Sequence, residues 1–272
     1  MPPPRRDTSF GANIKEHSGW WAPAAVVAAV VLLSLFVLVY YFVPNPVSLI
    51  EERPSPSTRI DRVATKVGSH TFMVPANYLV FASARKGGAR RAIDIAASLP
   101  DFRGYSDAER ALFTASGSTS PIVHIKIREE PYNVPEAARL ARVYLNQVVD
   151  PRGTPAPFGL TQYEFRDDSG YRGEDLFVGR DERPSPLAGE GSARVVRRSL
   201  GESGSARVRS TIVVLLCERP GTDVPSPNCL RDYPLGNGAA LSYRFKRTRL
   251  AKWRDIARGM SRLITSFEVL SP

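Results

Sequence analysis

The sequence predicts an α+β protein with one N-terminal transmembrane helix, followed by a mostly antiparallel sheet with packed helices and ending in a strand-helix unit. Three observations predict this class. The first is a run of 22 uncharged residues at 22–43. The second is a series of short segments in which apolar and polar residues alternate, and the third is a long helical apolar pattern at the C-terminus. The length of chain beyond residue 59 suits one sizeable domain or two small ones.

The apolar run is long enough to cross a bilayer. At 1.5 Å per residue it makes a helix of roughly 33 Å, close to the thickness of the hydrocarbon core. Trp20 and Trp21 at one end and Tyr40 and Tyr41 at the other suit the headgroup level. A cleaved signal peptide is the alternative, but its apolar part covers only about 7–15 residues and no small-residue cleavage pattern follows the run. We therefore expect an uncleaved signal anchor, with a transmembrane helix over 20–43.

Charge and cysteine usage indicate the same orientation. The N-terminal tail is basic, with Arg5, Arg6 and Lys15, which favours a cytoplasmic N-terminus. Cys217 and Cys229 flank a segment rich in Pro and Gly, and their spacing suits a disulfide that closes a surface loop in an oxidising compartment. A metal site is the rival interpretation, but neither a CxxC pair nor a histidine lies nearby. The sequence thus predicts a single-pass protein of the bacterial inner membrane with a periplasmic C-terminal domain.

Two segments flank the predicted span. Residues 1–19 are polar and too short to form a core, so we expect a disordered cytoplasmic tail. Residues 44–58 contain four prolines and indicate a semi-rigid linker that holds the domain, 59–272, away from the membrane. Within the span, small residues recur at a spacing of four and predict a face for contact with another membrane helix; they are Ala24, Ala25, Ala28 and Ala29.

Alternation and helical periodicity place the elements of the domain. The segments that predict strands are 71–74, 93–95, 123–127, 161–165, 176–178 and 194–200. The continuous apolar run 211–217 is typical of a central strand that is covered on both faces. Between these segments, apolar residues in 134–149 recur at spacings of three and four, and Pro135 suits the start of a helix there.

The last elements have the clearest pattern. Residues 241–246 alternate as a strand, and the period changes to that of a helix after Thr248, a candidate N-cap. We expect this helix to pack back on the sheet with Trp253 as a core anchor, and Arg254 and Arg258 to lie on its solvated side. The predicted apolar stripe consists of Leu250, Trp253, Ile256, Ala257, Met260, Leu263, Ile264 and Phe267.

Some stretches resemble a known group of proteins. Residues 74–109 contain VPANYLVFASARKGG and LPDFRGYSDAE, and the C-terminal part contains the Cys217–Cys229 segment followed by LSYRFKRTRLAKWRDIARGMSRLITSF. These stretches are similar to parts of single-pass, membrane-anchored periplasmic proteins of proteobacteria that have no assigned activity. The resemblance implies the location and the organisation of the chain, and it implies no chemistry.

The net charge of +10 raises the question of nucleic acid, but an extracytoplasmic domain meets little of it, so none is expected as a partner. Anionic lipid headgroups and an acidic partner are the two alternative targets of the positive field. One basic glycine turn between extended segments is a candidate site for a phosphate or a headgroup; its residues are Arg85, Lys86, Arg90 and Arg91. A solvated hairpin explains the same residues without any ligand, and it is the preferred interpretation.

The sequence contains none of the common catalytic motifs. It has no GxSxG, Walker, HExxH or Rossmann pattern, and its three histidines share no ligand spacing, so neither a cofactor nor a metal is expected. Acidic residues cluster in a loop-rich region, where a carboxylate pair for hydrolysis is the alternative to solvated turns. They are Asp167, Asp168, Glu174, Asp175, Asp181 and Glu182.

Two functions are therefore weighed. The favoured one is a non-enzymatic, membrane-tethered periplasmic protein that binds another membrane or periplasmic protein or serves as an accessory subunit of an envelope complex. A protein that neutralises a toxin delivered to the periplasm belongs to this class. The alternative is an envelope hydrolase that acts on cell-wall or glycan substrate through acidic residues. The oligomeric state stays open.

Overall fold

The computed structural model describes residues 21–42, 52–132, 134–181, 211–221 and 224–269. The chain divides into two compact units, Met1–Glu52 and Arg53–Pro272. The predicted tail, 1–19, and the predicted strand at 194–200 lie outside the described residues.

The described part of the first unit contains one helix, α1 (Trp21–Phe42), of 22 residues. A helix is thereby confirmed at the place of the apolar run, and large apolar side chains such as Val30 and Leu33 are exposed on it. The four alanines predicted to contact another helix are exposed as well. A search of the described residues for a helix with the length and hydropathy of a membrane span finds none. The span and the helix contact stay predictions.

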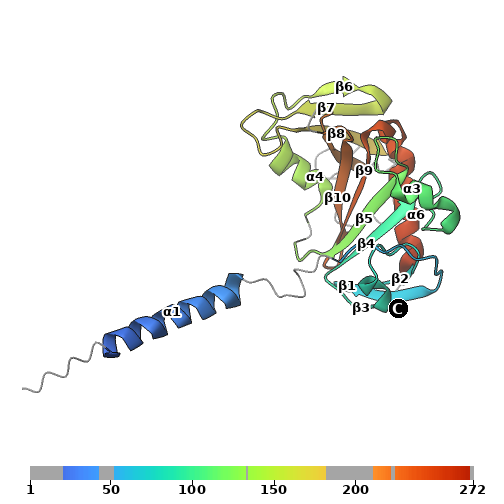
Figure 1. Ribbon diagram of the computed structural model, residues 1–272. Helices are drawn as coiled ribbons and strands as arrows, with labels where there is room; N and C mark the ends of the chain where they lie inside the picture. The colour runs from blue at the N-terminus through green and yellow to red at the C-terminus, as the bar shows by residue number, and fades with distance from the viewer. Residues whose placement is uncertain (1–20, 43–51, 133, 182–210, 222–223, 270–272) are drawn as a thin grey trace, which may run out of the picture. The chain divides into compact units, whose positions relative to one another are not determined.

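The second unit is built on two sheets, and the larger is antiparallel throughout its described strands (Figure 1). The smaller sheet has the order β12 (Glu268–Val269), β2 (His70–Pro75), β1 (Arg62–Val67) and β3 (Gly88–Ala89). The larger has the order β4 (Ala92–Ser98), β5 (Ile122–Glu129), β11 (Ala239–Lys246), β10 (Asn228–Gly236), β9 (Thr211–Glu218), β8 (Glu174–Asp181), β7 (Leu160–Glu164) and β6 (Thr154–Ala156). The predicted α+β class with a mostly antiparallel sheet is confirmed.

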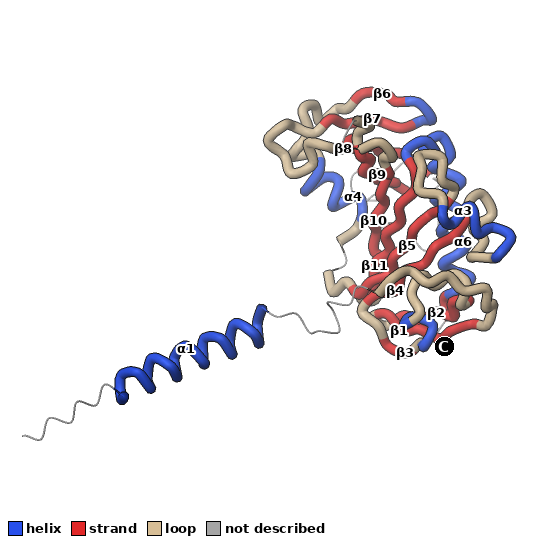
Figure 2. Tube along the Cα trace, viewed as in Figure 1, coloured by secondary structure: helices blue, strands red, loops and turns tan. Residues whose placement is uncertain are grey.

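The helices are mostly short. In the described part of the chain, the helices besides α1 and α6 (Trp253–Phe267) are α3 (Arg110–Thr114) and α4 (Glu136–Arg139), the π-helical turn η3 (Leu140–Tyr144), and the 3₁₀ turns η1 (Ser83–Lys86), η2 (Asp107–Glu109), η4 (Pro157–Gly159) and η5 (Arg247–Lys252). In both views α4 and α6 lie on opposite sides of the larger sheet (Figures 1 and 2).

The main core lies between the larger sheet, the smaller sheet and α6. Side chains alternate along a strand, so odd-numbered residues such as Ile125, Leu241 and Tyr243 all face α6 and are nearly inaccessible. Trp253 and Ile264 of α6 meet them, at 1% and 0% exposure. The predicted strand-helix unit is therefore confirmed, as is the place of Trp253 in the core.

The start of α6 differs from the prediction. Thr248 is not its N-cap, because it lies inside η5 and its hydroxyl donates to the carbonyl of Ser118 at 2.5 Å. Helix α6 begins only at Trp253, and the side chain of Lys252, which takes the N-cap position, makes no capping hydrogen bond. The hydroxyl is bonded to a loop that is far away in sequence. A capping rule considers only the residues next to the helix and does not include such a contact.

The basic side of α6 is less exposed than predicted. Arg254 lies over the ring of Trp253 at 4.4 Å and donates to the carbonyl of Phe158 at 2.8 Å. Arg258 forms an ion pair of 2.7 Å with Asp181 of β8. Both arginines therefore fasten the helix to neighbouring elements, whereas Arg262 is exposed.

The helix predicted over 134–149 is shorter. Pro135 takes the N-cap position of α4, and regular helix ends with η3 at Tyr144. Beyond that point the backbone pairs with the end of β7 and the residue after it, since the amide of Val149 donates to the main-chain carbonyl of Glu164 at 2.8 Å and Val148 bridges to Phe165. The same apolar spacing thus occurs first in a helix and then in an extended segment. Both contribute buried residues to a second cluster, which includes Leu140, Tyr144, Val148, Phe165 and Leu176.

The predicted strands at 71–74, 93–95, 123–127, 161–165, 176–178, 211–217 and 241–246 fall largely within β2, β4, β5, β7, β8, β9 and β11. Strands β1 and β10 were missed by the prediction. In β10 the alternation is hidden, because Arg231 faces the core while the apolar Leu230 is only half-buried on the other face.

Candidate functional site

The face of strands β4, β5 and β11 that points away from α6 is hollowed into a groove of about 520 Å³. Its floor consists of even-numbered residues, which alternate with the core residues along each strand. The ladder places Asp94 opposite Lys126, and Lys126 opposite Ser242. In the next row Arg244 lies opposite His124. The floor is therefore polar, and it is one face of a sheet whose other face packs in the core.

Aromatic side chains and prolines form the rim of the groove. Tyr78 and Phe81 contribute from the segment beside β4, and Tyr105 and Phe113 contribute from the region of α3. The rings of Tyr105 and Phe113 meet edge to face, with their centroids 5.4 Å apart. This rim gives an apolar wall to a groove whose floor carries charge.

The N-terminal end of the domain adds another wall. Pro54 and Pro56 line the groove, and the amide of Ser55 between them donates to the carbonyl of Val80 at 2.9 Å. Arg85 supports this contact, because it donates to the carbonyl of Leu79 and to the hydroxyl of Ser55. The last part of the predicted linker, 44–58, is therefore bound to the domain.

The two cations on the floor, Lys126 and Arg244, differ in whether a carboxylate is paired with them. Lys126 lies 3.3 Å from the carboxylate of Asp94 and is balanced by it. Arg244 is exposed, and within the described part of the chain its guanidinium has neither a hydrogen bond nor an ion pair. With Lys126 and Arg244 against the single carboxylate of Asp94, the lining carries an excess of positive charge.

His124 lies beside Arg244 on this floor. Desolvation of the ring lowers the pKa of His124 below its ordinary value of 6.5, and the positive charges of Lys246 and Arg244 lower it further, while Asp94 acts in the opposite direction. The ring is therefore neutral at pH 7, with one nitrogen that donates and one that accepts. Its nitrogens contact no protein partner among the described residues.

A second polar site lies where the larger sheet splits. Among the described residues, strands β9 and β10 pair only at Cys217 with Cys229 and at Leu216 with Leu230, although β9 pairs with β8 along its whole length. Beyond the split, Glu136 of α4 enters between the strands and accepts the amide of Val214 at 2.7 Å. A carboxylate thus replaces the missing strand as a hydrogen-bond partner.

The same carboxylate binds a buried arginine. Arg231 donates to both oxygens of Glu136, at 3.0 and 2.8 Å, and lies over the ring of Tyr233 at 4.4 Å. Burial is the largest single influence and lowers the pKa of Arg231, but the charge and hydrogen bonds of Glu136, together with Tyr243 and Tyr233, raise it well above the ordinary value. A cavity of about 60 Å³ adjoins this pair, which is too small for a substrate. We assign the pair a structural role.

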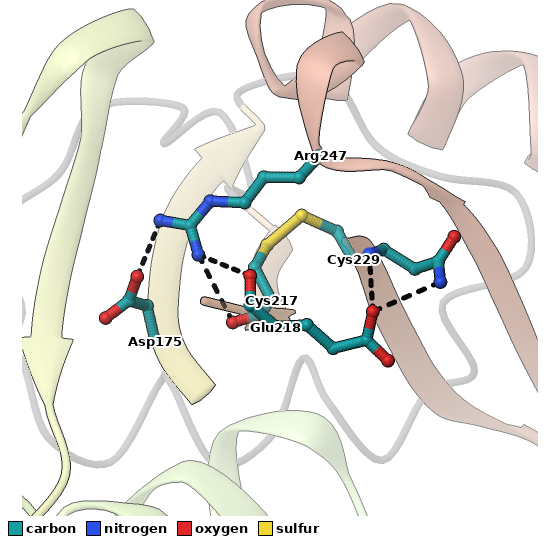
Figure 3. The surroundings of a disulfide bond; sticks show 6 residues. Asp175, Cys217, Glu218, Cys229 and Arg247 are labelled. Atoms are coloured by element: carbon teal, nitrogen blue, oxygen red, sulfur yellow. Dashed lines mark hydrogen bonds and ion pairs between the residues drawn. A yellow bond between two sulfur atoms is a disulfide. The ribbon is translucent and has the colours of Figure 1, made fainter. Parts of the chain in front are cut away.

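The disulfide between Cys217 and Cys229 is confirmed (Figure 3). It joins adjacent strands and both residues have 0% exposure, so it lies inside the sheet and not at the surface. Arg247 crosses beside it and donates to the carbonyl of Glu218 at 2.7 Å and to Asp175 at 2.5 Å. The bond therefore holds β9 to β10 at the only place where they pair in the described chain.

Replacing both Cys217 and Cys229 with alanine is expected to lower the free energy of unfolding by roughly 3 kcal/mol, because the bond closes a loop with a sequence separation of 12. Urea unfolding of the oxidised protein and of the double variant measures this loss. The oxidised protein, denatured without reductant, should show no free thiol. Two titratable thiols in protein taken from cells would contradict the prediction.

The predicted basic turn has a structure of its own. Arg85 and Lys86 end the turn η1, and Arg90 follows β3 and donates to the carbonyl of Ser83. Arg85 and Arg90 are thus engaged with main-chain oxygens, whereas Lys86 and Arg91 are exposed. These four residues do not line the groove. A phosphate or headgroup site at this turn stays a prediction.

Three of the acidic residues considered for hydrolysis form separate ion pairs with arginines. Asp175 is paired with Arg219 and Arg247, and Asp168 is paired with Arg166. Asp181 is paired with Arg258, while Glu182 lies outside the described residues.

One of these residues faces another carboxylate. Glu174 lies opposite Glu218 in the ladder, and desolvation and then the charge of Glu218 raise its pKa, while the charge of Arg244 acts in the opposite direction. Glu218, however, accepts both the amide and the side chain of Asn228, and neither glutamate lines the groove. No group of three or more His, Cys, Asp or Glu residues that suits a metal occurs in the described ranges.

Sequence reasoning missed the groove, although part of its signal was present. His124 and Lys126 alternate with isoleucines, and Arg244 alternates with Tyr243 and Phe245, so the pattern places each on the polar face of its own strand. The three residues are brought together because β5 pairs with β11, which follows it by more than 100 residues. No local pattern contains that pairing.

The fold and the groove together define an α+β domain with a concave, cationic sheet face. No model of a protein family matches the chain, and a search of curated proteins finds no match. Among solved structures, the chain is similar to an immunity protein of the Stenotrophomonas maltophilia type IV secretion system, with a TM-score of 0.44 and 16% identity, over 77% of this chain and 94% of that one. It is also similar to the iron-regulated outer membrane lipoprotein FrpD of Neisseria meningitidis, with a TM-score of 0.42 and 12% identity, over 79% and 96%. Both scores are too low to bear on function.

Proposed function

We propose that this protein is a membrane-tethered, extracytoplasmic interaction module that binds another envelope protein through the groove over β4, β5 and β11. The groove is the observation that carries the proposal. Its volume of about 520 Å³ falls in the range of ligand sites, about 300–1,000 Å³. Aromatic residues and arginine, which are enriched at protein interfaces, occur in it together.

The disulfide supports the extracytoplasmic location. Disulfides persist in oxidising compartments and are rare in the cytosol, where thiols are kept reduced. Both cysteines are fully buried, and each faces the other across the ladder. The periplasm of a bacterium is the compartment that fits a disulfide and a basic N-terminal tail together.

Helix α1 supports the tether. It contains 22 residues without a charge and exposes many large apolar side chains, a surface that soluble proteins rarely present to water. Covering by lipid removes that cost, and we propose α1 as a signal anchor in the inner membrane. Its small-residue face, with Ala24 and Ala28, is available for a second helix in the same bilayer.

Photo-crosslinking in living cells tests the proposed function. In the full-length protein, p-benzoylphenylalanine in place of Phe113, which lines the groove, is expected to form a covalent adduct with another envelope protein. The control is the same probe in place of Tyr132, which is 78% exposed and does not line the groove. The location is checked in parallel, because alkaline phosphatase fused to the C-terminus is active only outside the cytoplasm. An inactive fusion, or no adduct from Phe113, would overturn the proposal.

A further inference from the structure

We infer that the partner segment in the groove is acidic, and that Arg244 and His124 hold one of its carboxylates while the aromatic rim packs against an apolar neighbour. This inference rests on the proposed function, because it names the chemistry of the segment that the groove receives. It follows from the charges of the floor, the state of Arg244 and the composition of the rim.

The first step is that some arginines of this domain form ion pairs within the chain and Arg244 does not. Arg231, Arg247 and Arg258 each form an ion pair with a carboxylate of the same chain. Arg244, in contrast, is exposed in the groove and forms none with the described residues. A guanidinium offers a planar fork of N–H donors that matches a carboxylate with two parallel hydrogen bonds. The charge of Arg244 lowers the pKa of Glu174, but no carboxylate of the described residues forms an ion pair with this fork, so its donors are available to a carboxylate of another molecule.

The second step is the neighbour of Arg244. His124 lies directly opposite in the β5–β11 ladder, so both side chains rise from the same place on the floor. The neutral ring offers one N–H to a carboxylate oxygen without adding a second full charge. Asp94, the carboxylate of the lining, is engaged by Lys126 at 3.3 Å, and it does not cancel the charge of Arg244.

The third step is the rim. Tyr78, Phe81, Tyr105 and Phe113 present apolar ring surface beside the cationic floor. Such a wall suits an apolar side chain, and aromatic anchors contribute much of the binding energy of protein interfaces. The groove therefore matches a segment in which an acidic residue stands close to an apolar one.

An anionic lipid headgroup is the other source of negative charge, and the floor fits it less well. Sites that recognise anionic lipids typically combine about 4–8 lysines and arginines. On this floor Arg244 is the cation that forms no ion pair with the described residues, because Lys126 is already paired. A single fork of donors between apolar walls is suited to one carboxylate on a peptide.

The experiment identifies the crosslinked segment and then changes the charge. The adduct from the probe at position 113 of the full-length protein is digested, and its partner peptide is sequenced by mass spectrometry. We expect a segment with a net negative charge. Arg244→Glu should reduce the adduct at least ten-fold, and Arg244→Gln should reduce it less. Arg262→Glu, a matched reversal on the exposed side of α6, should leave the yield unchanged.

The outcomes separate the two proposals. A neutral or basic partner segment, or an adduct that is insensitive to Arg244→Glu, overturns the acidic segment and leaves the interaction module standing. An adduct with lipid and no protein overturns both, as does the absence of any adduct. Since Arg244 is exposed, its variants should accumulate to the wild-type level, and the oxidised disulfide in each variant serves as the check of folding.

Discussion

Replacing Glu136 with leucine is expected to lower the free energy of unfolding of the domain by about 3–5 kcal/mol. The change leaves the charge of Arg231 buried without its carboxylate, because the two side chains are only 10% and 7% exposed. It also removes the acceptor of the Val214 amide, at the point where β9 and β10 have separated. A buried donor without an acceptor costs about 1–3 kcal/mol by itself. Urea unfolding of the fragment from residue 52 onward measures the loss.

Two controls make this prediction specific. The double variant Glu136→Leu, Arg231→Leu removes both charges, and it should recover much of the stability that the single variant loses, since an apolar pair replaces a buried ion pair at little cost. Asp107→Ala breaks the ion pair with Arg110, whose side chains are 68% and 67% exposed, and it should cost less than about 1 kcal/mol. If Glu136→Leu unfolds at the same urea concentration as the wild type, the pair does not hold the split sheet together.

Replacing Trp253 with alanine is expected to cost about 3–5 kcal/mol, a large share of a domain stability of about 5–15 kcal/mol. The indole is 1% exposed and its N–H donates to the carbonyl of Phe158 at 3.1 Å. Strand β8 is shaped to receive it, because a Cβ at Gly179 would lie 2.5 Å from the ring. Removal of the indole therefore leaves a cavity between α6 and β8 and a carbonyl that loses one donor.

Thermal melts of the same fragment measure this second effect. Arg262→Ala on the exposed side of α6 is the control, and it should change stability by no more than about 0.5 kcal/mol. Arg254 is unsuitable as a control, because it covers the indole at 4.4 Å and its loss exposes the ring. A melting temperature for Trp253→Ala equal to that of the wild type would show that α6 does not pack on the sheet through this residue.

The features that the sequence by itself determined are those in which apolar residues repeat at short intervals along the chain. The apolar run at 22–43 has the pattern of a helix, and α1 occupies it. Alternation in 123–127 and 241–246 located β5 and β11, and the stripe with Trp253 located α6, because each burial pattern repeats within a few residues. The disulfide could be predicted from the number and the spacing of the cysteines alone, and the two cysteines are bonded.

The tertiary structure alone decided how these elements meet and where charge is buried. Glu136 and Arg231 are 95 residues apart. A charged residue such as Arg231 at a core-facing position argues against a buried strand at β10 as long as its partner is not known. Arg244 and His124 each look like ordinary surface residues of an alternating strand, and only the β5–β11 ladder places them together beneath an aromatic rim. Local periodicity reports which face of an element is buried. Pairing between distant strands decides which exposed faces combine into a groove, since that choice depends on the packing of the whole core.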